Sequence, residues 1–376
     1  MRLRLLLAVS VFLPLIFIRA TSLGDGRAVS AKLEAGKHPR LPHVDAFLQL
    51  SFRRVPGQAD GEAVLDTGEV GSWYSHSVDL PTVDFDGRLY RMWFVGGSET
   101  ADPGVPYGIY QRVGLAESRD GISWTLGNGG KPVLDLGPPG AFDSKGISHP
   151  YVLRVGKKYL MWYGGIDGRQ AKDLGLKPNH VRIERIGLAT SNDGIHWKRA
   201  NSGKPVLDIG AKDSIDSIQA TGMHVLRISG RFVMWYGAYN GVHTLGIATS
   251  SDGIRWEKIN QGKAVTGLLG PEQLGPSVYF DGARYFMLYN RNFGRQWATY
   301  GATSIDGIHW VPAFEGQPVL GPPPAGNFGT AGQGRNHSVH PSQILVEGRR
   351  VRVWYAAEDG SPPHHQRVGL MEATLP

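Results

Sequence analysis

The stretch Ser191-Asn192-Asp193-Gly194-Ile195-His196-Trp197 is one copy of a Ser-x-Asp-Gly-Ile-x-Trp motif that this chain carries four times. The other three copies span residues 118–124, 250–256 and 304–310. A valine follows each serine after 15 residues, at Val133, Val206, Val265 and Val319. A spacing that recurs without change indicates a repeated structural unit, so this repeat is the feature that decides the fold.

A second element precedes each motif and occurs five times. It is an aromatic strand of the Met-Trp-Tyr type, at residues 92–94, 161–163, 234–236, 287–289 and 353–355. A strand start lies 12 residues before the central residue of the first four copies and 13 before the last, at Pro81, Pro150, Met223, Pro276 and Pro341. A glycine-containing turn separates the two segments, which predicts that each unit opens with a hairpin.

Each unit continues with a Gly-Leu/Ile-Ala type of strand, the Asp-Gly turn and a fourth strand through the motif tryptophan. Five such units predict an all-β, five-bladed β-propeller over residues 45–376, with four antiparallel strands per blade. The fifth unit lacks a fourth strand, and an orphan Val-Leu-Asp at residues 64–66 matches residues 133–135. We therefore expect residues 45–66 to close the ring as the outer strand of the last blade. The blades are expected at 67–136, 137–209, 210–267, 268–321 and 322–376 plus 45–66.

The residues that recur in every unit are expected to be architecture. The turn aspartates should hydrogen-bond the backbone of their own turns, and the motif tryptophans should pack between blades. A pseudo-symmetric ring needs a single active site, so catalytic residues should be those that differ between units.

Residues 1–20 have the features of a secretory signal peptide. Arg2 and Arg4 give a basic start, and the apolar run at 5–18 is too short for a comfortable membrane span. A flexible segment is expected at 21–44. We expect a secreted or periplasmic protein without stable membrane insertion after cleavage. An anchor formed by an uncleaved leader is the alternative, because Arg19 lies at the expected cleavage site.

Composition excludes several other classes of protein. The chain has no cysteine, so it has no disulfide framework. Its formal charge of +7 is spread along the chain rather than gathered in runs, so no nucleic-acid partner is expected. The 52 glycines and 24 prolines suit a protein with many turns.

Candidate site residues are the polar ones that break the repeat. The position before each first-strand Pro or Met reads Leu80, His149, Gly222, Gly275 and His340, with Asp79 beside the first. Variable loops are expected on the same rim, where binding residues usually gather. The residues expected to contact substrate are His76, Asp143, His149, Gln219, Tyr239, Arg291, His337, His340 and Glu358.

Three segments of the second unit resemble a known superfamily. Residues 142–150 read Phe-Asp-Ser-Lys-Gly-Ile-Ser-His-Pro, residues 161–165 read Met-Trp-Tyr-Gly-Gly, and residues 186–197 run from Ile-Gly-Leu through the motif. They are similar to the five-bladed β-propeller glycoside hydrolases, which include the invertases and levansucrases of families 32 and 68, the arabinanases and xylosidases of family 43, and the mannoside phosphorylases of family 130. The resemblance covers essentially residues 45–376.

The resemblance implies an aspartate at the start of blade 1 as base or nucleophile, a second aspartate before the blade-2 proline, and a glutamic acid near the start of blade 3. Asp79 lies near the first position, whereas His149 and Gly222 stand at the other two. Glycoside hydrolysis uses two carboxyl groups, one of them protonated. Asp79, Glu272 and Asp216 are therefore the candidate catalytic residues, with Asp143, Glu184 and Glu358 as other possible partners for Asp79.

The resulting hypothesis is an exported glycosidase that cleaves oligo- or polysaccharides with carboxylates in the propeller funnel. The alternative is a glycan-binding propeller that has lost the catalytic acid. A sialidase-like enzyme is disfavoured, because the turn reads Ser-x-Asp-Gly and the units number five. No cofactor is expected, although neutral imidazoles are good metal ligands and a cation near His149 and His340 is one possibility.

Overall fold

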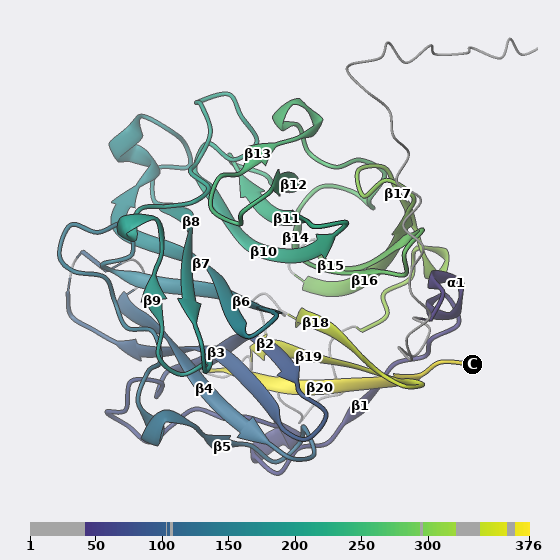
Figure 1. Ribbon diagram of the computed structural model, residues 1–376. Coiled ribbons are helices and arrows are strands. Elements are labelled where there is room, and N and C mark those ends of the chain that lie inside the picture. Colours follow the sequence, from purple (N-terminus) through teal and green to yellow (C-terminus); the bar gives the residue numbers. More distant parts are fainter. Residues whose placement is uncertain (1–41, 103, 106–107, 294–295, 321–338, 359–364) are drawn as a thin grey trace, which may run out of the picture. The chain divides into compact units, whose positions relative to one another are not determined.

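The computed structural model describes residues 42–376, except 103, 106–107, 294–295, 321–338 and 359–364 (Figure 1). The expected leader and nearly all of the segment expected at 21–44 lie outside these residues. The described chain belongs to a unit that spans Leu41–Pro376. It is almost entirely β-structure, and its helices are short.

The strands of the described residues fall into five antiparallel groups, numbered here in chain order. Group 1 contains β2 (Ser77–Phe85), β3 (Tyr90–Glu99), β4 (Ile109–Ser118) and β5 (Thr125–Leu126). Group 2 contains β6 (Gly146–Val155), β7 (Lys158–Gln170), β8 (Arg182–Ser191) and β9 (Lys198–Arg199). Group 3 contains β10 (Gln219–Ile228), β11 (Arg231–Tyr239), β12 (His243–Ser250) and β13 (Glu257–Lys258).

Group 4 contains β14 (Gln273–Phe280), β15 (Tyr285–Phe293), β16 (Gln296–Ser304) and β17 (Trp310–Pro312). Group 5 contains β18 (Val339–Glu347), β19 (Arg350–Glu358), β20 (Gln366–Thr374) and β1 (Arg53–Val55). The helices are α1 (Val44–Phe47) and the 3-10 turns Asp60–Glu62, Asn128–Gly130, Ala171–Leu174, Asn201–Gly203, Asn260–Gly262 and Phe314–Gly316.

Group 5 is completed by the N-terminal part of the described chain. Arg53 pairs with Glu372, and Leu65 forms an isolated antiparallel bridge with Val368. The expected pairing of this segment with the last strand is therefore present. The expected strand at 45–66 is shorter than predicted, because residues 44–47 form α1 instead.

The first strands of the groups lie against one another in the order of the sequence. Strand β2 contacts β6, β6 contacts β10, β10 contacts β14, β14 contacts β18, and β18 contacts β2. Single parallel bridges, Gln219 with Glu184 and Ser77 with Gln366, also link neighbouring groups. These first strands carry Asp79, His149 and His340, which line the candidate site.

The repeated Ser-x-Asp-Gly turn is built as expected. In the second copy, Asp193 Oδ1 accepts the backbone N–H groups of Ile195 at 2.9 Å and His196 at 2.8 Å, and Ser191 Oγ accepts the N–H of Gly194 at 2.9 Å. Gly194 has a φ of 78°, a left-handed conformation that costs a residue with a Cβ about 1–2 kcal/mol. The interpretation of the turn aspartates as architecture is confirmed.

Neighbouring groups are joined at seams by a tryptophan from the second strand of one group. The indole Nε1 of Trp93 donates to the carbonyl oxygen of Gly194 at 2.8 Å. The same bond is made by Trp162 to Gly253 at 3.0 Å, by Trp235 to Gly307 at 2.8 Å and by Trp354 to Gly121 at 2.9 Å. Each acceptor lies in the Asp-Gly turn of the next group, so four seams share one design.

The motif tryptophan of each turn completes the same seam. Trp197 donates to the Gly194 carbonyl at 3.0 Å, so this oxygen accepts two indole N–H groups. The rings of Trp93 and Trp197 meet edge to face at 6.2 Å and 87°. The expected packing of the motif tryptophans between groups is confirmed.

The seam between groups 4 and 5 is built differently. Leu288 stands where the other groups have the donor tryptophan, and no Ser-x-Asp-Gly turn follows β20 in this sequence. Helix α1 fills the seam. Val44 and Phe47 are fully buried, and the Phe47 ring lies 4.5 Å from that of Tyr279 and 5.1 Å from that of Phe286.

Polar contacts fix α1 in this position. The backbone N–H of Val44 donates to Asp281 Oδ2 at 2.8 Å, and the Tyr279 hydroxyl donates to the Pro42 carbonyl at 2.9 Å. Arg284 also bonds to Asp45. Asp281 lies in the hairpin turn of group 4, so this turn holds the N-terminal segment at the seam.

Candidate functional site

The first strands bend where they meet, and the bend sets the direction of the candidate site residues. In four groups the pairing register shifts across this point, between Asp79 and Thr82 in group 1 and between Ser148 and Tyr151 in group 2, for example. Leu80 and His149 adopt left-handed φ values of 49° and 46° within these shifts. Non-glycine residues in this conformation are uncommon and often mark functional positions.

Two adjoining recesses open beside these bends, and together they are called the central cavity. The first has a volume of about 320 Å³ and is lined by Asp79, Leu80, Ile109, Gln111, His149, Arg182, Leu274, His340 and Gln366. The second has a volume of about 250 Å³ and is lined by His149, Val181, Arg182, Glu184, Gln219, Thr221, Tyr239, His243 and Leu274. They share His149, Arg182 and Leu274, so the cavity runs from group 1 to group 3 and is bounded by groups 4 and 5.

Asp79, His149 and His340 are candidate site residues from the sequence, and the structure places all three in the wall of the first recess. The Asp79 side chain is 5% exposed, and its Oδ1 accepts the backbone N–H of Leu80 at 2.7 Å. The left-handed turn at Leu80 explains how Asp79 reaches the cavity although Leu80 separates it from Pro81. A buried carboxylate at a cavity wall is suited to act on a bound substrate.

The second carboxylate of the cavity is Glu184, at the start of β8. Its Oε1 accepts hydrogen bonds from the hydroxyls of Ser148 and, at 2.7 Å, Thr221. Arg182 Nε lies 3.4 Å from Oε2, and His149 Nδ1 lies 3.6 Å from Oε1. Burial alone would raise the pKa of Glu184, but the Arg182 charge and the hydrogen bonds from His149 and Ser148 hold that pKa below its usual range. Glu184 is therefore an ionised structural partner rather than a proton donor.

Three histidines surround the cavity. The amide Nδ2 of Asn290 lies 2.7 Å from His340 Nδ1, and the His243 ring lies 4.4 Å from that of Tyr239. Burial, together with the charges of His149 and His243, lowers the pKa of His340 to about 3. Burial and the charge of His149 lower the pKa of His243 to about 4. Both side chains are therefore neutral near pH 7.

Asp216 and Asp143 occupy equivalent positions outside the central cavity. Asp216 is 1% exposed and accepts the Tyr236 hydroxyl at 2.9 Å, with Lys258 Nζ at 2.6 Å. Asp143 is fully buried and accepts the hydroxyl of Tyr163 in the same way, with Arg199 as its cation. Each forms a buried ion pair, and neither lines the central cavity. The structure therefore does not bring the candidate catalytic Asp216 to Asp79.

Glu272 lies at the edge of the site rather than in its wall. It adopts a left-handed φ of 63° before β14, and it does not line either recess. Burial raises the pKa of Glu272, against a hydrogen bond from the His243 backbone that lowers it. Glu272 thus accepts a hydrogen bond from the backbone of a cavity residue, His243.

The remaining expected substrate contacts are divided. Gln219 and Tyr239 line the second recess. Arg291 packs its guanidinium 5.8 Å from the centre of the Tyr300 ring and does not line the cavity. His76 lines a separate recess with Trp73, Glu99, Arg112 and His365. His337 and the side chain of Glu358 lie outside the described parts of the chain.

Several cavity residues share one position in the third strands, and of these the sequence analysis named only Glu184. Three residues before the repeated glycine of each third strand stand Gln111, Glu184, His243, Ala298 and Gln366. The four polar members line the central cavity. They are polar and differ between groups, which is the signal that could have identified them. Arg182, two residues before Glu184 on the same side of β8, was also missed.

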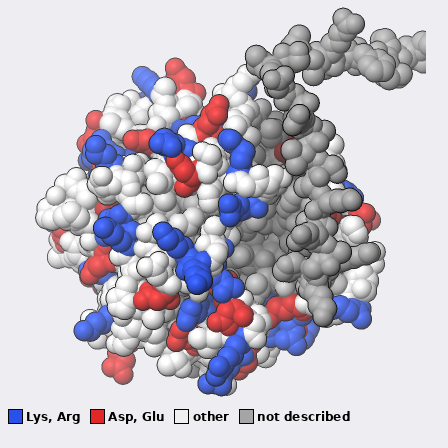
Figure 2. Space-filling model, viewed as in Figure 1, with Lys and Arg blue, Asp and Glu red and all other residues white. Residues whose placement is uncertain are grey.

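The described residues were also compared with what a metal ion, a membrane or a charged partner would require. Among the described residues, no group of three or more His, Cys, Asp or Glu side chains is placed to hold a metal ion. No helix in the described ranges is long and apolar enough to cross a membrane. Basic and acidic side chains are intermixed on the face shown in Figure 2.

The comparisons with known proteins bear on the fold. No protein-family model matches the chain. It is 28% identical over 268 residues, 66% of its length and 80% of the relative's, to "Uncharacterized protein MT1551" of Mycobacterium tuberculosis (strain CDC 1551 / Oshkosh). It is 27% identical over 160 residues, 41% of its length and 47% of the relative's, to a β-1,2-mannobiose phosphorylase of Thermoanaerobacter sp. (strain X514).

Solved structures share its architecture. A structure described as "The GH130 family of mannoside phosphorylases contains glycoside hydrolases that target beta-1,2 mannosidic linkages in Candida mannan" has a TM-score of 0.64 at 16% identity, covering 86% of this chain and 96% of its own. The family 117 glycoside hydrolase Zg3597 of Zobellia galactanivorans has a TM-score of 0.60 at 14% identity, covering 87% and 91%. The fold is that of the propeller-type glycoside hydrolases. The resemblance expected from the second unit is thus confirmed at the level of the fold.

Proposed function

We propose that the protein is a carbohydrate-active enzyme that cleaves glycosidic bonds at the central cavity. The observation that carries this proposal is the position of Asp79, a buried carboxylate in the wall of a cavity of about 320 Å³. Tyr239, Gln219, Gln111 and the cavity histidines supply hydrogen-bonding and stacking groups of the kind that sugars require. The shared fold with glycoside hydrolases supports the same assignment by analogy.

We further propose that the five strand groups form a closed five-bladed propeller. The cyclic contacts among β2, β6, β10, β14 and β18 support this arrangement, as does the pairing of β1 with β20. An experimental structure tests it directly, since a sixth blade or a separated β1 would contradict the proposal.

The acceptor of the cleaved sugar distinguishes two versions of the reaction. Water as acceptor gives hydrolysis, and inorganic phosphate as acceptor gives a sugar phosphate. The name of the Thermoanaerobacter relative supports testing the second version for this chain. Purified protein should be incubated with β-1,2-mannobiose, arabinan, xylan, fructan and aryl glycosides, with and without phosphate, and the products should be separated as free sugar and sugar phosphate.

Asp79→Asn is the decisive variant. We expect it to lower turnover by at least 100-fold while the melting temperature changes little, because the charge serves chemistry rather than packing. Asp84→Asn on the same strand is the matched control. Burial raises the pKa of Asp84, and its side chain does not line the cavity, so turnover should be retained. An Asp79→Asn enzyme with full activity would contradict the role of Asp79.

A glycan-binding protein without catalysis is the second candidate. One observation favours it: Glu184, the other carboxylate of the cavity, is committed to Arg182 and to two hydroxyls. Under this candidate, calorimetry would detect sugar binding, Asp79→Asn would weaken it modestly, and no substrate would be cleaved.

We also propose that the protein is exported and that its leader is removed. The basic start and the apolar run at 5–18 support this proposal. N-terminal sequencing of the protein recovered outside the cytoplasm tests it. A mature chain that still begins at Met1 would favour the anchored alternative.

A further inference from the structure

We propose that His149 donates the proton to the departing sugar oxygen and that Glu184 is its positioning residue. This inference rests on the proposed function and names the missing acid of that site. It uses neither of the carboxyl groups expected from the sequence, Glu272 and Asp216. It follows from the hydrogen-bond geometry around one imidazole ring.

Two neighbouring hydroxyl groups determine which nitrogen of the neutral His149 ring carries the proton. The ring nitrogen Nδ1 lies 3.0 Å from Ser148 Oγ and 3.2 Å from Thr221 Oγ1. Both hydroxyls donate their single proton to Glu184 Oε1. Their oxygens can therefore only accept from Nδ1, which requires the proton of the neutral ring to be on Nδ1. The second nitrogen, Nε2, is then the one that gains and loses a proton.

The space around Nε2 determines which groups this nitrogen can contact. The His149 side chain is 17% exposed, and it lines both recesses of the central cavity. Gly222 lies beside the ring, where a Cβ would come 3.3 Å from Cδ2 and 3.6 Å from Nε2. No hydrogen bond to Nε2 is found among the described residues. A substrate oxygen in the cavity is therefore a suitable partner for Nε2.

Charged groups surround the His149 ring. The groups around His149 are the anions Asp79 and Glu184, the cation Arg182, and the imidazoles of His243 and His340. Glu184 is buried and ionised next to Nδ1, so it stabilises a positive ring. His149 is thus the cavity imidazole whose Nδ1 lies beside a buried carboxylate.

The equivalent positions in the other groups show that the arrangement is specific to group 2. Leu80, Gly222 and Gly275 carry no titratable side chain. His340 has Asn290 at Nδ1 in place of a carboxylate. Within the described residues, the combination of a cavity histidine with a buried carboxylate therefore occurs at His149 alone.

In hydrolysis, His149 acts on the departing sugar and Asp79 acts on the attacking water. The Nε2 proton of the charged His149 ring moves to the glycosidic oxygen as the bond to the anomeric carbon breaks, and that oxygen keeps the electron pair. Asp79 removes a proton from the water whose oxygen bonds to the anomeric carbon. Solvent then returns a proton to Nε2 and takes one from Asp79, which restores both groups.

The activity test compares leaving groups. His149→Gln should lower kcat/KM by about 100-fold or more on an aryl glycoside with a poor leaving group. On the 2,4-dinitrophenyl glycoside of the same sugar it should lower kcat/KM by less than about 10-fold, because this leaving group departs without protonation. Equal losses on both substrates would overturn the acid role. His340→Gln is the comparator and should show no such difference between leaving groups.

The positioning role of Glu184 has its own readout. In the wild type, the basic limb of the pH–rate profile should report the loss of the acid proton, and Glu184→Gln should move this limb to lower pH because the carboxylate no longer stabilises the charged ring. An unmoved limb would overturn the positioning role. Thr221→Val, which keeps the carboxylate and removes one hydroxyl, should move the limb less and serves if Glu184→Gln does not fold.

A measurement without substrate separates this inference from the proposed function. Long-range ¹H–¹⁵N spectra of the wild type should show the neutral His149 ring with its proton on Nδ1, and Glu184→Gln should weaken that preference. A proton on Nε2 would overturn the positioning role even if the enzyme is active. If the wild type cleaves no glycoside, the acid role falls with the proposed function, whereas the Nδ1 tautomer still decides the role of Glu184.

Discussion

The seam between groups 3 and 4 and the seam between groups 4 and 5 solve the same packing problem with different parts of the chain. In the first, Trp235 donates to the Gly307 carbonyl of the neighbouring turn. In the second, Leu288 replaces the tryptophan and Phe47 of α1 fills the space, although it comes from the opposite end of the sequence. A repeat can therefore lose a recurring tryptophan contact at one seam if another segment buries the exposed surface.

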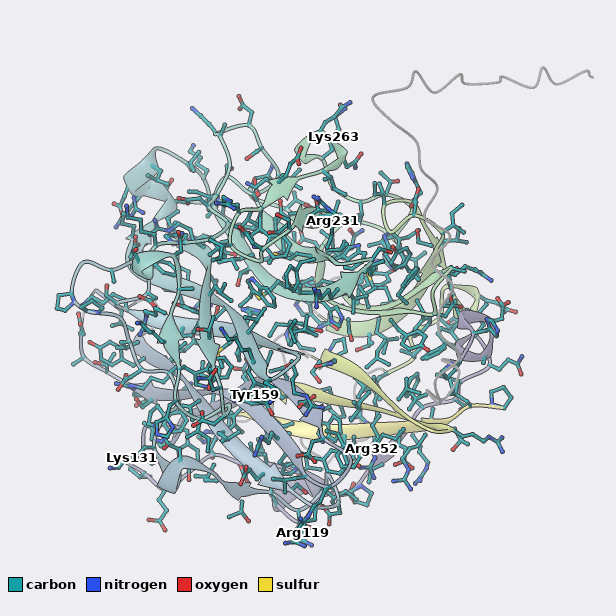
Figure 3. The ribbon with its side chains drawn as sticks, viewed as in Figure 1. Arg119, Lys131, Tyr159, Arg231, Lys263 and Arg352 are labelled. Atoms are coloured by element: carbon teal, nitrogen blue, oxygen red, sulfur yellow. The ribbon has the colours of Figure 1, made fainter. Side chains whose placement is uncertain are left out.

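The two designs differ in what they depend on. The tryptophan seams combine a large buried ring with one directed hydrogen bond, and both partners are part of the repeat. Arg352, which is labelled in Figure 3, lies at the seam between groups 5 and 1. It strengthens this seam because it donates to the Asp120 carbonyl at 2.7 Å. The helix seam relies on apolar burial and on contacts of Asp281 with the N-terminal segment. Deletions and substitutions at the seams can separate these contributions.

The largest effect is expected from deletion of residues 42–50. Val44, Phe47 and Leu50 are buried, and their loss should cost about 6 kcal/mol at about 2 kcal/mol for each side chain. This is comparable to the whole stability of many domains, so we expect insoluble or unfolded protein. A chain that lacks residues 1–40 but keeps α1 is the control, and its melting temperature should be unchanged. Soluble, folded material from the longer deletion would show that the seam does not need α1.

Trp235→Ala should have the next largest effect, about 3–5 kcal/mol in the free energy of unfolding measured with urea. Trp235→Phe keeps most of the buried ring and removes the bond to Gly307, so its cost should contain about 1 kcal/mol for that bond. If the two variants were equally destabilised, the hydrogen bond rather than burial would dominate the tryptophan seams.

Leu288→Trp tests whether the two designs can be exchanged. At the seam between groups 4 and 5, the space beside Leu288 is filled by α1. We expect destabilisation by about 1–3 kcal/mol through overpacking, seen as a lower urea midpoint. A stabilised variant would mean that the seam contains unfilled space and that α1 packs less tightly than the tryptophans.

The smallest effect is expected on the stability of the fold at low pH. Burial alone would raise the pKa of Asp120, but hydrogen bonds from its turn lower it to about 2. Because the folded pKa lies below the unfolded value of about 3.9, the stabilisation is complete above that value and is lost as the pH falls towards 2. Asp120→Asn should flatten the decline of the melting temperature between pH 5 and 2. An unchanged decline would assign it to other groups, such as Asp281.

The repeat made most of the architecture predictable. Its fixed intervals located the first and second strands, and the 13-residue interval of the fifth unit coincides with a register shift that lies further along β18 than in the other groups. Helix α1 could not be predicted in this way. Its four residues have no helical pattern of their own, and their conformation depends on Asp281, which is 237 residues away in the sequence.

The repeat also explains why only part of the candidate site could be predicted. Asp79, His149 and His340 were found because they interrupt the repeat at the first strand. Arg182 and His243 were missed because binding residues were expected on loops, whereas these residues lie at the starts of β8 and β12. Asp216 and Asp143 were predicted as site residues and lie in buried ion pairs outside the central cavity. A buried ion pair and a catalytic carboxylate look alike in sequence.

The pairing of β1 with β20 has a consequence for the newly made chain. Arg53 bonds to Glu372, 319 residues later, so the partner of β1 leaves the ribosome long after β1 itself. Until then β1 and the apolar side chains of α1 lack part of their final surroundings. Closing so long a loop is slow, because its entropy is lost before the contacts form. The early groups must therefore wait in a partly assembled state, in which binding by a chaperone would protect the unpaired strands.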